Sequence, residues 1–551
     1  MTGHFRTPFG ERIFQNKYAH EGCETWPELA DVLVEDVCRK VLSSNEKGLL
    51  KQFITDMKFI PGGRYLYYAG RKLKYFNNCY LLISQEDSRE DWAATSWKHE
   101  SCLMTGGGTG NDYSVYRARG TRLGRTGGVA SGPIPKAHMT NEQGRQVMQG
   151  GHRRSAMYAS LMVDHGDAMD FIHAKDWHKM MIPGTDLSLW DIKQRDFNFA
   201  APLDMTNISL NYNTDWLMKS ERTGDTGEVF NEAVKQALMT GEPGWSFNFF
   251  EKEFETGRNA CTEVTTDTDN DVCNLGSVNL ANINNLDELR SVVWLASRFL
   301  YCGTLVADLP YEAIKVVREK NRRLGLGLMG VHEWLIKRGF RYEAVPELHE
   351  WLGEYRDVSE DAADDLADRL GLARPCAYRA IAPTGTIGIL AGTTTGIEPL
   401  FSVAYKRRYL QNGSTWAYEY VVDGAAQVMI DYYDVDPDKI ESALDLAADP
   451  ERRIKFQYEV QKYVDMSISS TLNIPAWGTE LNNESHVKGF GKLVAKYASG
   501  LRGLTVYPDG ARGGQPLTSV PYWEAKDKVG QQFTEEWTDV CELRGGGTCG
   551  V

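Results

Sequence analysis

From about residue 59 onward, the chain alternates short β-prone runs with longer helical stretches, and glycine-rich turns separate them. Residues 78–83 and 155–163 are β-prone runs that are too short for typical helices. Apolar residues recur at helical spacing over residues 286–305 and over about 345–370, which predicts two amphipathic helices. This alternation favours an α/β fold, in which helices surround a sheet or a barrel.

The two ends of the chain differ from this middle part. Thr25-Trp-Pro-Glu28 has the spacing of a helix capping box, and apolar residues follow it at helical spacing. We therefore expect an N-terminal helical region over residues 1–58, followed by the main domain over residues 59–520. The segment from residue 521 to residue 551 contains a run of three glycines near its end and is expected to be a flexible tail.

Charge and hydropathy argue against several classes of protein. The net charge of −14 disfavours a chain-wide electrostatic grip on a nucleic-acid polymer. No run approaches the ~18 apolar residues of a membrane span, and residues 1–10 lack the apolar segment of a signal peptide. We expect no membrane contact and a cytoplasmic location. The ten cysteines are too sparse for a disulfide scaffold and form no CxxC pair, so no metal site is expected.

One short segment carries an amide, a thiol and a carboxylate at alternate positions: Asn259-Ala-Cys261-Thr-Glu263. In an extended segment, residues two positions apart point to the same side, so these three groups would meet one ligand. A nucleophilic cysteine normally has a histidine as its base, and none stands in the adjacent sequence. The alternative is a buried cysteine flanked by surface polar residues.

Two further cysteines stand next to polar residues in β-prone runs. These are Cys79, in Asn77-Asn-Cys79-Tyr, and Cys273, in Asp271-Val-Cys273-Asn. Neighbouring strands would place two such thiols side by side, where they could form and break a disulfide. Each one alone is also compatible with an inert core cysteine.

The run Cys-Asn-Leu-Gly-Ser-Val-Asn-Leu from Cys273, after the N-x-C-x-E segment, resembles a signature of the large catalytic subunit of ribonucleotide reductases. Further motifs similar to that family stand in family order: Pro61-Gly-Gly-Arg64, Gly106-Gly-Gly-Thr-Gly110, Gly150-Gly-His-Arg-Arg154, Asn321-Arg-Arg-Leu-Gly-Leu-Gly-Leu-Met-Gly330, Ala382-Pro-Thr-Gly-Thr-Ile-Gly388, Asp465-Met-Ser-Ile-Ser-Ser-Thr-Leu-Asn-Ile-Pro475 and Thr505-Val-Tyr-Pro-Asp-Gly510. The resemblance implies a ten-stranded α/β barrel with a central finger loop that carries Cys261.

The resemblance also implies chemical roles. Cys261 would carry a thiyl radical that abstracts the ribose 3′-hydrogen, Glu263 would be the base on the 3′-hydroxyl, and Asn259 would bind the sugar hydroxyls. Cys79 and Cys273 would protonate the departing 2′-hydroxyl and supply two electrons. A nucleotide-binding homologue without catalysis is the alternative from another class, and it would need none of these thiols.

The same resemblance implies binding sites and partners. The substrate would be a ribonucleoside di- or triphosphate, contacted by Asn78, Gly108 and a phosphate loop of Pro383, Thr384, Gly385, Thr386 and Ile387. A deoxynucleotide effector would bind at Asp87, Ser88 and Arg117. Residues 177–205 form a longer segment than is usual where the family's specificity loops lie. The family further favours a homodimer.

The final cysteines, Cys541 and Cys549, flank the glycine run and resemble the family's redox tail. Such a tail would reduce the Cys79–Cys273 disulfide by exchange and would itself be reduced by thioredoxin or glutaredoxin. A metal-binding end and a disordered terminus with incidental cysteines are the alternatives.

The source of the radical can also be argued from resemblance. Thr505-Val-Tyr-Pro-Asp-Gly-Ala-Arg-Gly-Gly-Gln515 resembles the TVYRDGSRxGQ stretch of the class that depends on adenosylcobalamin, with Pro508 in place of arginine. Activation by a separate metal-containing subunit, the alternative, would need adjacent tyrosines here, and only Tyr507 is present. No Asp-x-His-x-x-Gly motif offers a histidine ligand to cobalt. The N-terminal region is also shorter than the family's ATP-binding cone.

Overall fold

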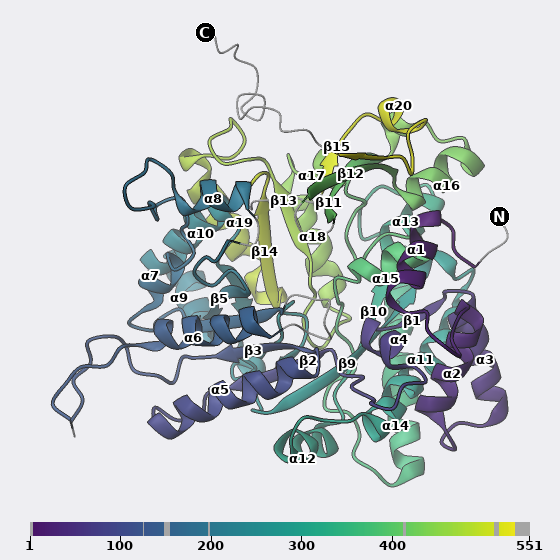
Figure 1. Cartoon of the computed structure of the whole chain (residues 1–551), viewed down its shortest axis with the longest axis horizontal. Helices are drawn as coiled ribbons and strands as arrows, with labels where there is room; N and C mark the ends of the chain where they lie inside the picture. Colours follow the sequence, from purple (N-terminus) through teal and green to yellow (C-terminus); the bar gives the residue numbers. More distant parts are fainter. Residues whose placement is uncertain are drawn as a thin grey trace.

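A barrel of mostly parallel strands forms the centre of the molecule (Figure 1). The computed structural model describes residues 4–124, 126–147, 155–196, 199–411, 415–511 and 517–534. The barrel strands, in spatial order, are β1 (Phe59–Pro61), β9 (Asp271–Asn279), β2 (Cys79–Ile83), β3 (Gly108–Asp112), β4 (Met157–Met162), β5 (Thr206–Tyr212), β6 (Gly244–Phe247), β14 (Gly503–Pro508) and β13 (Thr471–Ile474), with β10 (Leu324–Met329) paired to β9. The expected ten-stranded α/β barrel is confirmed.

Two isolated bridges join the open ends of this sheet. Leu326 of β10 pairs with Arg379, and Ile381 pairs with Ile468, which lies shortly before β13 in the chain. Most neighbours are parallel, but β9 runs antiparallel to β1 and β2, and β14 runs antiparallel to β6. The barrel is therefore closed, and its interior is separated from the helices outside it.

A short hairpin crosses the interior of the barrel. Its strands are β7 (Gly257–Arg258) and β8 (Thr265–Thr266), which pair antiparallel. The carbonyl oxygen of Arg258 lies 1.8 Å from the place that a Cβ on Gly110 of β3 would occupy. On the opposite wall, the backbone N–H of Ser467 donates to the carbonyl of Glu263 at 2.8 Å. The hairpin and its loop are the expected finger.

Three helices that the sequence predicts are confirmed, one from its capping box and two from their apolar periodicity. Thr25 and Glu28 form the capping box of α2 (Trp26–Cys38). The two predicted amphipathic helices are α11 (Leu286–Val306) and α14 (Pro346–Leu370). The other helices are α1 (Pro8–Lys17), α3 (Ser44–Thr55), α4 (Gly63–Tyr68), α5 (Arg89–Met104), α6 (Pro133–Gln146), α7 (Ala168–Ile172), α8 (Leu189–Arg195), α9 (Thr214–Thr223), α10 (Glu228–Thr240), α12 (Glu312–Asn321), α13 (Val331–Lys337), α15 (Gly385–Ala391), α16 (Gly424–Tyr433), α17 (Ala443–Leu446), α18 (Pro450–Gln461), α19 (Val487–Tyr497) and α20 (Tyr522–Ala525), with 3₁₀ turns at Phe250–Lys252, Leu280–Asn282, Pro437–Lys439, Glu484–His486 and Ala498–Gly500.

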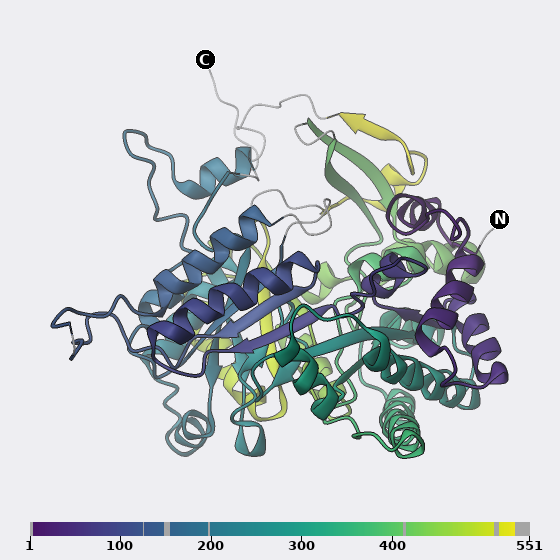
Figure 2. The same cartoon turned by 60° about the horizontal axis from the view of Figure 1, so that its bottom comes forward.

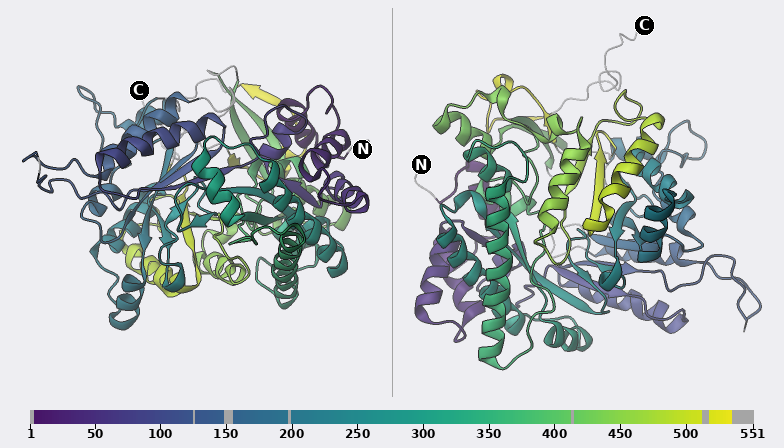
Figure 3. Two further views of the ribbon diagram at one scale, coloured as in Figure 1. Left: turned by 90° about the horizontal axis from the view of Figure 1, so that it is seen from below. Right: turned by 180° about the vertical axis from the view of Figure 1, so that it is seen from behind.

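The helices cover the barrel as two groups. The N-terminal helices α2 and α3 lie beside α11 and α14 (Figure 3). They share one apolar core, in which Trp26 and Leu33 belong to the same cluster as Phe299 and Leu300. On another side, α5 and α6 run next to each other across the barrel (Figure 2). Among the described residues, no helix has the length and apolarity to cross a membrane. Within residues 4–58, helices α2 and α3 are thus packed against helices of the barrel domain.

A second, four-stranded sheet lies outside the barrel. It is formed by β15 (Leu517–Ser519), β11 (Ala404–Gln411), β12 (Thr415–Val422) and β16 (Gln532–Thr534), in that order. Helix α20 packs on it, with Ala525 and Tyr420 in one apolar cluster. The predicted start of the tail at residue 521 is therefore wrong, because α20 and β16 follow that residue. Strand β16 is part of this sheet, and α20 packs on it.

The close approach of the finger to β3 gives a prediction about stability. In Gly110→Ala, the new methyl group would overlap the Arg258 carbonyl, and backbone cannot move aside as a side-chain end can. We expect the free energy of unfolding to fall by about 1–3 kcal/mol or more, measured by urea denaturation. Gly48→Ala in α3 is the control, since a Cβ there meets nothing within 4 Å. Equal stability of the two variants would contradict the crossing of the finger at β3.

Candidate active site

The finger loop between β7 and β8 is a tight turn and not the extended segment expected from the sequence. The backbone N–H of Thr262 donates to the carbonyl of Asn259 at 3.0 Å, and Thr262 has φ of 68°, in the left-handed region. Despite this turn, Asn259 and Glu263 still converge on one group. The Asn259 amide donates to the Cys79 sulfur at 3.0 Å, and that sulfur lies 4.0 Å from Oε1 of Glu263.

The register of β2 and β9 brings the two other predicted thiols together. Cys79 and Cys273 are direct cross-strand partners, and Gly108 of β3 is the partner of Cys79 on its other side. Directly opposed residues in an antiparallel pair have Cβ atoms about 4.5–5.5 Å apart, close to disulfide geometry. Both cysteines are free thiols in the structure. The predicted pair is therefore adjacent and needs only a small approach to form a bond.

A buried polar cluster fixes this register. Asp271 of β9 forms an ion pair with Arg323 at 2.9 Å and accepts hydrogen bonds from Thr266 of β8 and Asn321. Asp271 is fully buried, and Arg323 is 6% exposed. One carboxylate thus joins β9, the finger and the start of β10, and sequence reasoning missed it because its partners stand up to 52 positions away.

Burial dominates the electrostatics of the site. It raises the pKa of Glu263 to about 7, and it raises the pKa values of the Cys79 and Cys273 thiols well above their usual range. The Glu263 carboxylate next to Cys79 and the neighbouring Cys261 raise the pKa of Cys79 further. Both thiols are therefore protonated at neutral pH, and Glu263 titrates close to it.

Cys261 differs from the four residues around it in exposure. It is half-buried, whereas Cys79, Cys273, Asn259 and Glu263 are all at most 3% exposed. Oε2 of Glu263 and Oδ1 of Asn78 are buried and have no hydrogen-bond partner among the described residues. Unpaired buried acceptors are costly, so these atoms are suited to a ligand that carries hydroxyl or N–H donors.

The predicted phosphate loop is followed by a helix, which is the condition for binding phosphate with backbone N–H groups. Helix α15 begins at Gly385, and Thr384 before it has φ of 50°. The Thr384 hydroxyl accepts a hydrogen bond from the N–H of Gly396 at 2.7 Å, which closes the loop on itself. Ala382, next to Pro383, packs against the cluster that contains Cys79 and Cys273. The loop and the paired thiols therefore adjoin each other, with Thr386 and Ile387 in the first turn of α15.

The N-terminal segment closes on the far end of this helix, which the sequence did not indicate. Arg6 forms an ion pair with buried Glu333 at 2.7 Å, and Glu333 accepts a hydrogen bond from Thr393, just beyond α15, at 2.5 Å. Gly10 of α1 has no room for a Cβ, which would lie 2.7 Å from the carbonyl oxygen of Leu390. Helix α15 is thus braced from outside the barrel.

The predicted effector residues lie at the start of α5. Asp87 and Arg117 form an ion pair, and both side chains are about one-third exposed. Ser88 is the N-cap of α5, where its hydroxyl accepts from the N–H of Asp91 at 3.1 Å. The structure therefore gives Ser88 a local structural role, and it brings Asp87 and Arg117 together.

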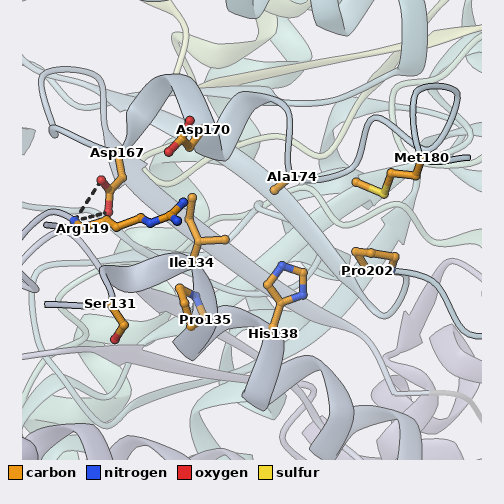
Figure 4. A pocket seen from close by; sticks show the side chains of 10 residues that line it. All are labelled: Arg119, Ser131, Ile134, Pro135, His138, Asp167, Asp170, Ala174, Met180 and Pro202. Atoms are coloured by element: carbon orange, nitrogen blue, oxygen red, sulfur yellow. Dashed lines mark hydrogen bonds between the residues drawn. The ribbon is translucent and has the colours of Figure 1, made fainter.

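A cavity of about 450 Å³ opens at Arg119, two residues after Arg117 (Figure 4). The backbone N–H of Arg119 is held by both carboxylate oxygens of Asp167, at 3.0 and 2.9 Å. Met180 and Pro202 line the cavity from the long segment predicted at residues 177–205, which folds around α8. Burial lowers the pKa of His138, which faces the same space, so this side chain is neutral at physiological pH.

The other cysteines differ in burial, and two of them lie outside the described residues. Cys541 and Cys549, like the Gly150–Arg154 motif, lie outside the described residues. Cys23, Cys38, Cys102 and Cys302 are buried, as expected of packing residues, but Cys376 is exposed and does not fit that assignment. Over the part of the chain that the structure describes, no group of three or more His, Cys, Asp and Glu side chains could hold a metal ion.

Known proteins have sequences similar to that of this chain. A vitamin B12-dependent ribonucleoside-diphosphate reductase of Mycobacterium tuberculosis (strain CDC 1551 / Oshkosh) is 29% identical over 520 residues, covering 85% of this chain and 72% of that protein. The protein of the same name from Thermoplasma acidophilum is 28% identical over 523 residues, covering 85% of this chain and 66% of that protein.

A solved structure and a family pattern complete the comparison. The class Id ribonucleotide reductase alpha subunit of Actinobacillus ureae superposes with a TM-score of 0.70 at 16% identity, over 92% of this chain and 97% of that one, which shows a common fold. The pattern of the ribonucleotide reductase barrel domain matches residues 77–349 and 371–507, which include the finger, the paired thiols and the phosphate loop. The chain therefore belongs to the ribonucleotide reductase family.

Proposed function

We propose that this chain reduces ribonucleoside diphosphates to 2′-deoxyribonucleoside diphosphates by radical chemistry that starts at Cys261. The observation that carries the proposal is the meeting of Asn259, Glu263 and the opposed pair Cys79 and Cys273 around one buried site beside Cys261. The names of the relatives from Mycobacterium tuberculosis and Thermoplasma acidophilum favour the diphosphate as substrate. A protein that only bound nucleotides would have no use for this set of thiols.

The first step takes place at the sugar. A thiyl radical on Cys261 takes the 3′-hydrogen of the ribose, because S–H and activated C–H bonds are close enough in strength for reversible transfer. Glu263 accepts the proton of the 3′-hydroxyl, and its pKa of about 7 suits a base that works near neutral pH. The Asn259 amide lies next to Cys79 and Glu263 and is suited to hold the sugar hydroxyls.

The second step uses the paired thiols. Cys79 and Cys273 together supply two protons and two electrons: the 2′-hydroxyl leaves as water, the sugar is reduced, and the two sulfurs end as a disulfide. The hydrogen first taken by Cys261 returns to the 3′-carbon, so the radical on Cys261 is regenerated. The raised pKa values of both thiols support this role, since thiols that stay protonated at neutral pH can act as acids.

The other expected contacts belong to the same proposal. Asn78 and Gly108 adjoin Cys79, and the loop from Pro383 to Ile387 would bind the diphosphate. Asp87 and Arg117 would bind a deoxynucleotide effector. Cys541 and Cys549 would return electrons from thioredoxin or glutaredoxin to the Cys79–Cys273 disulfide, and a homodimer is the expected assembly.

Adenosylcobalamin is the proposed radical source, following the names of the relatives that are vitamin B12-dependent. When bound, this cofactor supplies a carbon-centred radical that can take the hydrogen of a thiol. The structure fits this requirement in one respect: Cys261 alone among the five central residues is not fully buried, so a bulky group can reach it. The single Tyr507 on β14, followed by Pro508, offers no tyrosine pair for a radical that arrives from a separate subunit.

Replacement of Cys261 tests the proposed function. Cys261→Ser should abolish deoxynucleotide formation, because an O–H bond is too strong for reversible hydrogen transfer, while binding of the ribonucleotide stays unchanged in equilibrium dialysis. Cys23→Ser is the matched control, since Cys23 packs in the apolar core of the N-terminal helices with Trp26, and it should retain activity. Turnover that survived Cys261→Ser would show that the radical lies elsewhere.

The dependence of turnover on pH tests the role of Glu263. The carboxylate must be ionised to accept a proton, so kcat/KM should rise with pH and level off above about 7. Glu263→Gln should lose most of the activity and remove this rise. A rise centred near the ordinary glutamate pKa, or one that persisted in Glu263→Gln, would assign the base to another group.

The cofactor is tested separately. Purified chain, adenosylcobalamin, substrate and a chemical dithiol should suffice for turnover, and the visible absorption of the cobalamin should change when effector is added. The control is the chain with cobalamin that lacks the adenosyl group, which should be inactive. Turnover that appeared only after addition of a second, metal-containing protein would favour the alternative radical source.

A further inference from the structure

The carbonyls of the two residues that flank Cys261, Ala260 and Thr262, each accept a hydrogen bond from a side chain outside the turn. The Asn207 amide donates to the carbonyl of Ala260 at 2.9 Å, and Nη1 of Arg258 donates to the carbonyl of Thr262 at 3.2 Å. We propose that Asn207 and Arg258 are positioning residues that bracket Cys261 and fix its sulfur relative to the substrate sugar. This inference rests on the proposed function of Cys261.

Arg258 is anchored through both terminal nitrogens, while its buried Nε has no hydrogen-bond partner among the described residues. It is fully buried, and its Nη2 donates to Oδ1 of Asn248 at 2.9 Å and to the carbonyl of Arg502 at 2.6 Å. No carboxylate among the described residues forms an ion pair with it. Burial lowers its pKa to about 10, so it remains a cation at neutral pH.

A buried guanidinium without a carboxylate is unfavourable unless its donors are used. Here the planar fork joins three parts of the chain at once: the finger loop at Thr262, the segment after β6 at Asn248, and the residue before β14 at Arg502. A lysine in its place has one ammonium and cannot span these acceptors with the same geometry. The need to reach these three acceptors at once therefore explains why an arginine stands at position 258.

Asn207 supplies the second anchor from a different part of the wall. It lies on β5, where its cross-strand partner is Tyr158 of β4, and its amide reaches Ala260 on the finger. Ala260 is also close to β3, because a Cβ on Gly108 would lie 3.3 Å from the Ala260 Cβ. The two anchors, from β5 and from the β6–β14 side, restrain the loop in different directions.

The turn that carries the thiol is closed by a backbone hydrogen bond, which the N–H of Thr262 donates to the carbonyl of Asn259. Hydrogen transfer needs the reacting atoms within about 3–3.5 Å, and a displacement of about 1 Å can lower the rate about 100-fold. Side chains that fix the carbonyls next to Cys261 therefore bear directly on the rate of hydrogen transfer.

Two conservative variants test this bracket. Arg258→Lys keeps the charge but loses the fork, and Asn207→Asp keeps the shape but places an acceptor opposite the Ala260 carbonyl. Each should lower kcat by about 10- to 100-fold and leave the KM for the diphosphate within about threefold. With 3′-deuterated substrate, the isotope effect on kcat should increase, because hydrogen transfer becomes slower than the later steps.

Matched controls separate positioning from general destabilisation. Arg318→Lys alters another buried arginine that donates to a backbone carbonyl, that of Ala307, far along the chain from the finger. Asn483→Asp alters an amide that donates to the carbonyl of Thr479 on an exposed turn. Both controls should keep the isotope effect of the unmodified chain. Because Asn207 is exposed, Asn207→Asp tests the bracket even if Arg258→Lys is unstable.

A measurement that needs no turnover distinguishes the positioning role of Asn207 and Arg258 from the proposed function of the chain. Amide hydrogen exchange at residues 261–264, in the chain without nucleotide, should become at least about tenfold faster in Arg258→Lys and in Asn207→Asp, and alkylation of Cys261 by iodoacetamide should accelerate in parallel. Unchanged exchange, or a rise in KM with unchanged kcat, would overturn the bracket. Absence of turnover in the unmodified chain would instead overturn the proposed function and leave the exchange result valid.

Discussion

The pairing of β2 with β9 is the contact on which the site depends. It places Cys79 opposite Cys273, and a shift by one residue would turn one of the two sulfurs to the other face of the sheet. Asp271, two residues before Cys273, fixes this register through its buried ion pair with Arg323 and its hydrogen bond from Thr266. Because Thr266 belongs to the finger, one carboxylate fixes both the thiol pair and the base of the loop that carries Cys261.

Burial then determines the chemistry of the groups that this framework collects. The interior keeps Cys79 and Cys273 protonated and brings Glu263 to a pKa of about 7. In water, the same carboxylate would be ionised at neutral pH and would not titrate there. The barrel interior therefore brings two protonated thiols and one carboxylate into a small volume. The proposed proton transfers use these three groups and no histidine.

Side chains also restrain two loops of the site. Arg258 and Asn207 hold the carbonyls of the residues on either side of Cys261, whereas Arg6 and Glu333 hold the end of α15. In both cases a side chain compensates for a short element that has few backbone hydrogen bonds of its own. Catalytic loops on rigid strands commonly need such support, because hydrogen transfer and phosphate binding both depend on small displacements.

The sequence by itself determined the local structure and the residue types of the site. Helix α2 follows from its capping box and apolar periodicity, and helices α11 and α14 follow from apolar periodicity alone, signals that act within a few turns. The motifs around Cys261 and Cys273 identified the family. The expected extended form of residues 259–263 was wrong, since Thr262 adopts a left-handed turn that no local signal indicated.

Only the tertiary structure decided which of these groups meet. Cys79 and Cys273 are 194 positions apart, and Arg6 and Glu333 are 327 positions apart. The anchors of the finger, Asn207 and Arg258, belong to different strands, and neither stands in a motif that predicts its partner. Such contacts depend on strand register and on the closure of the barrel, which sequence periodicity does not encode, because periodicity specifies the buried face of an element but not the element opposite it.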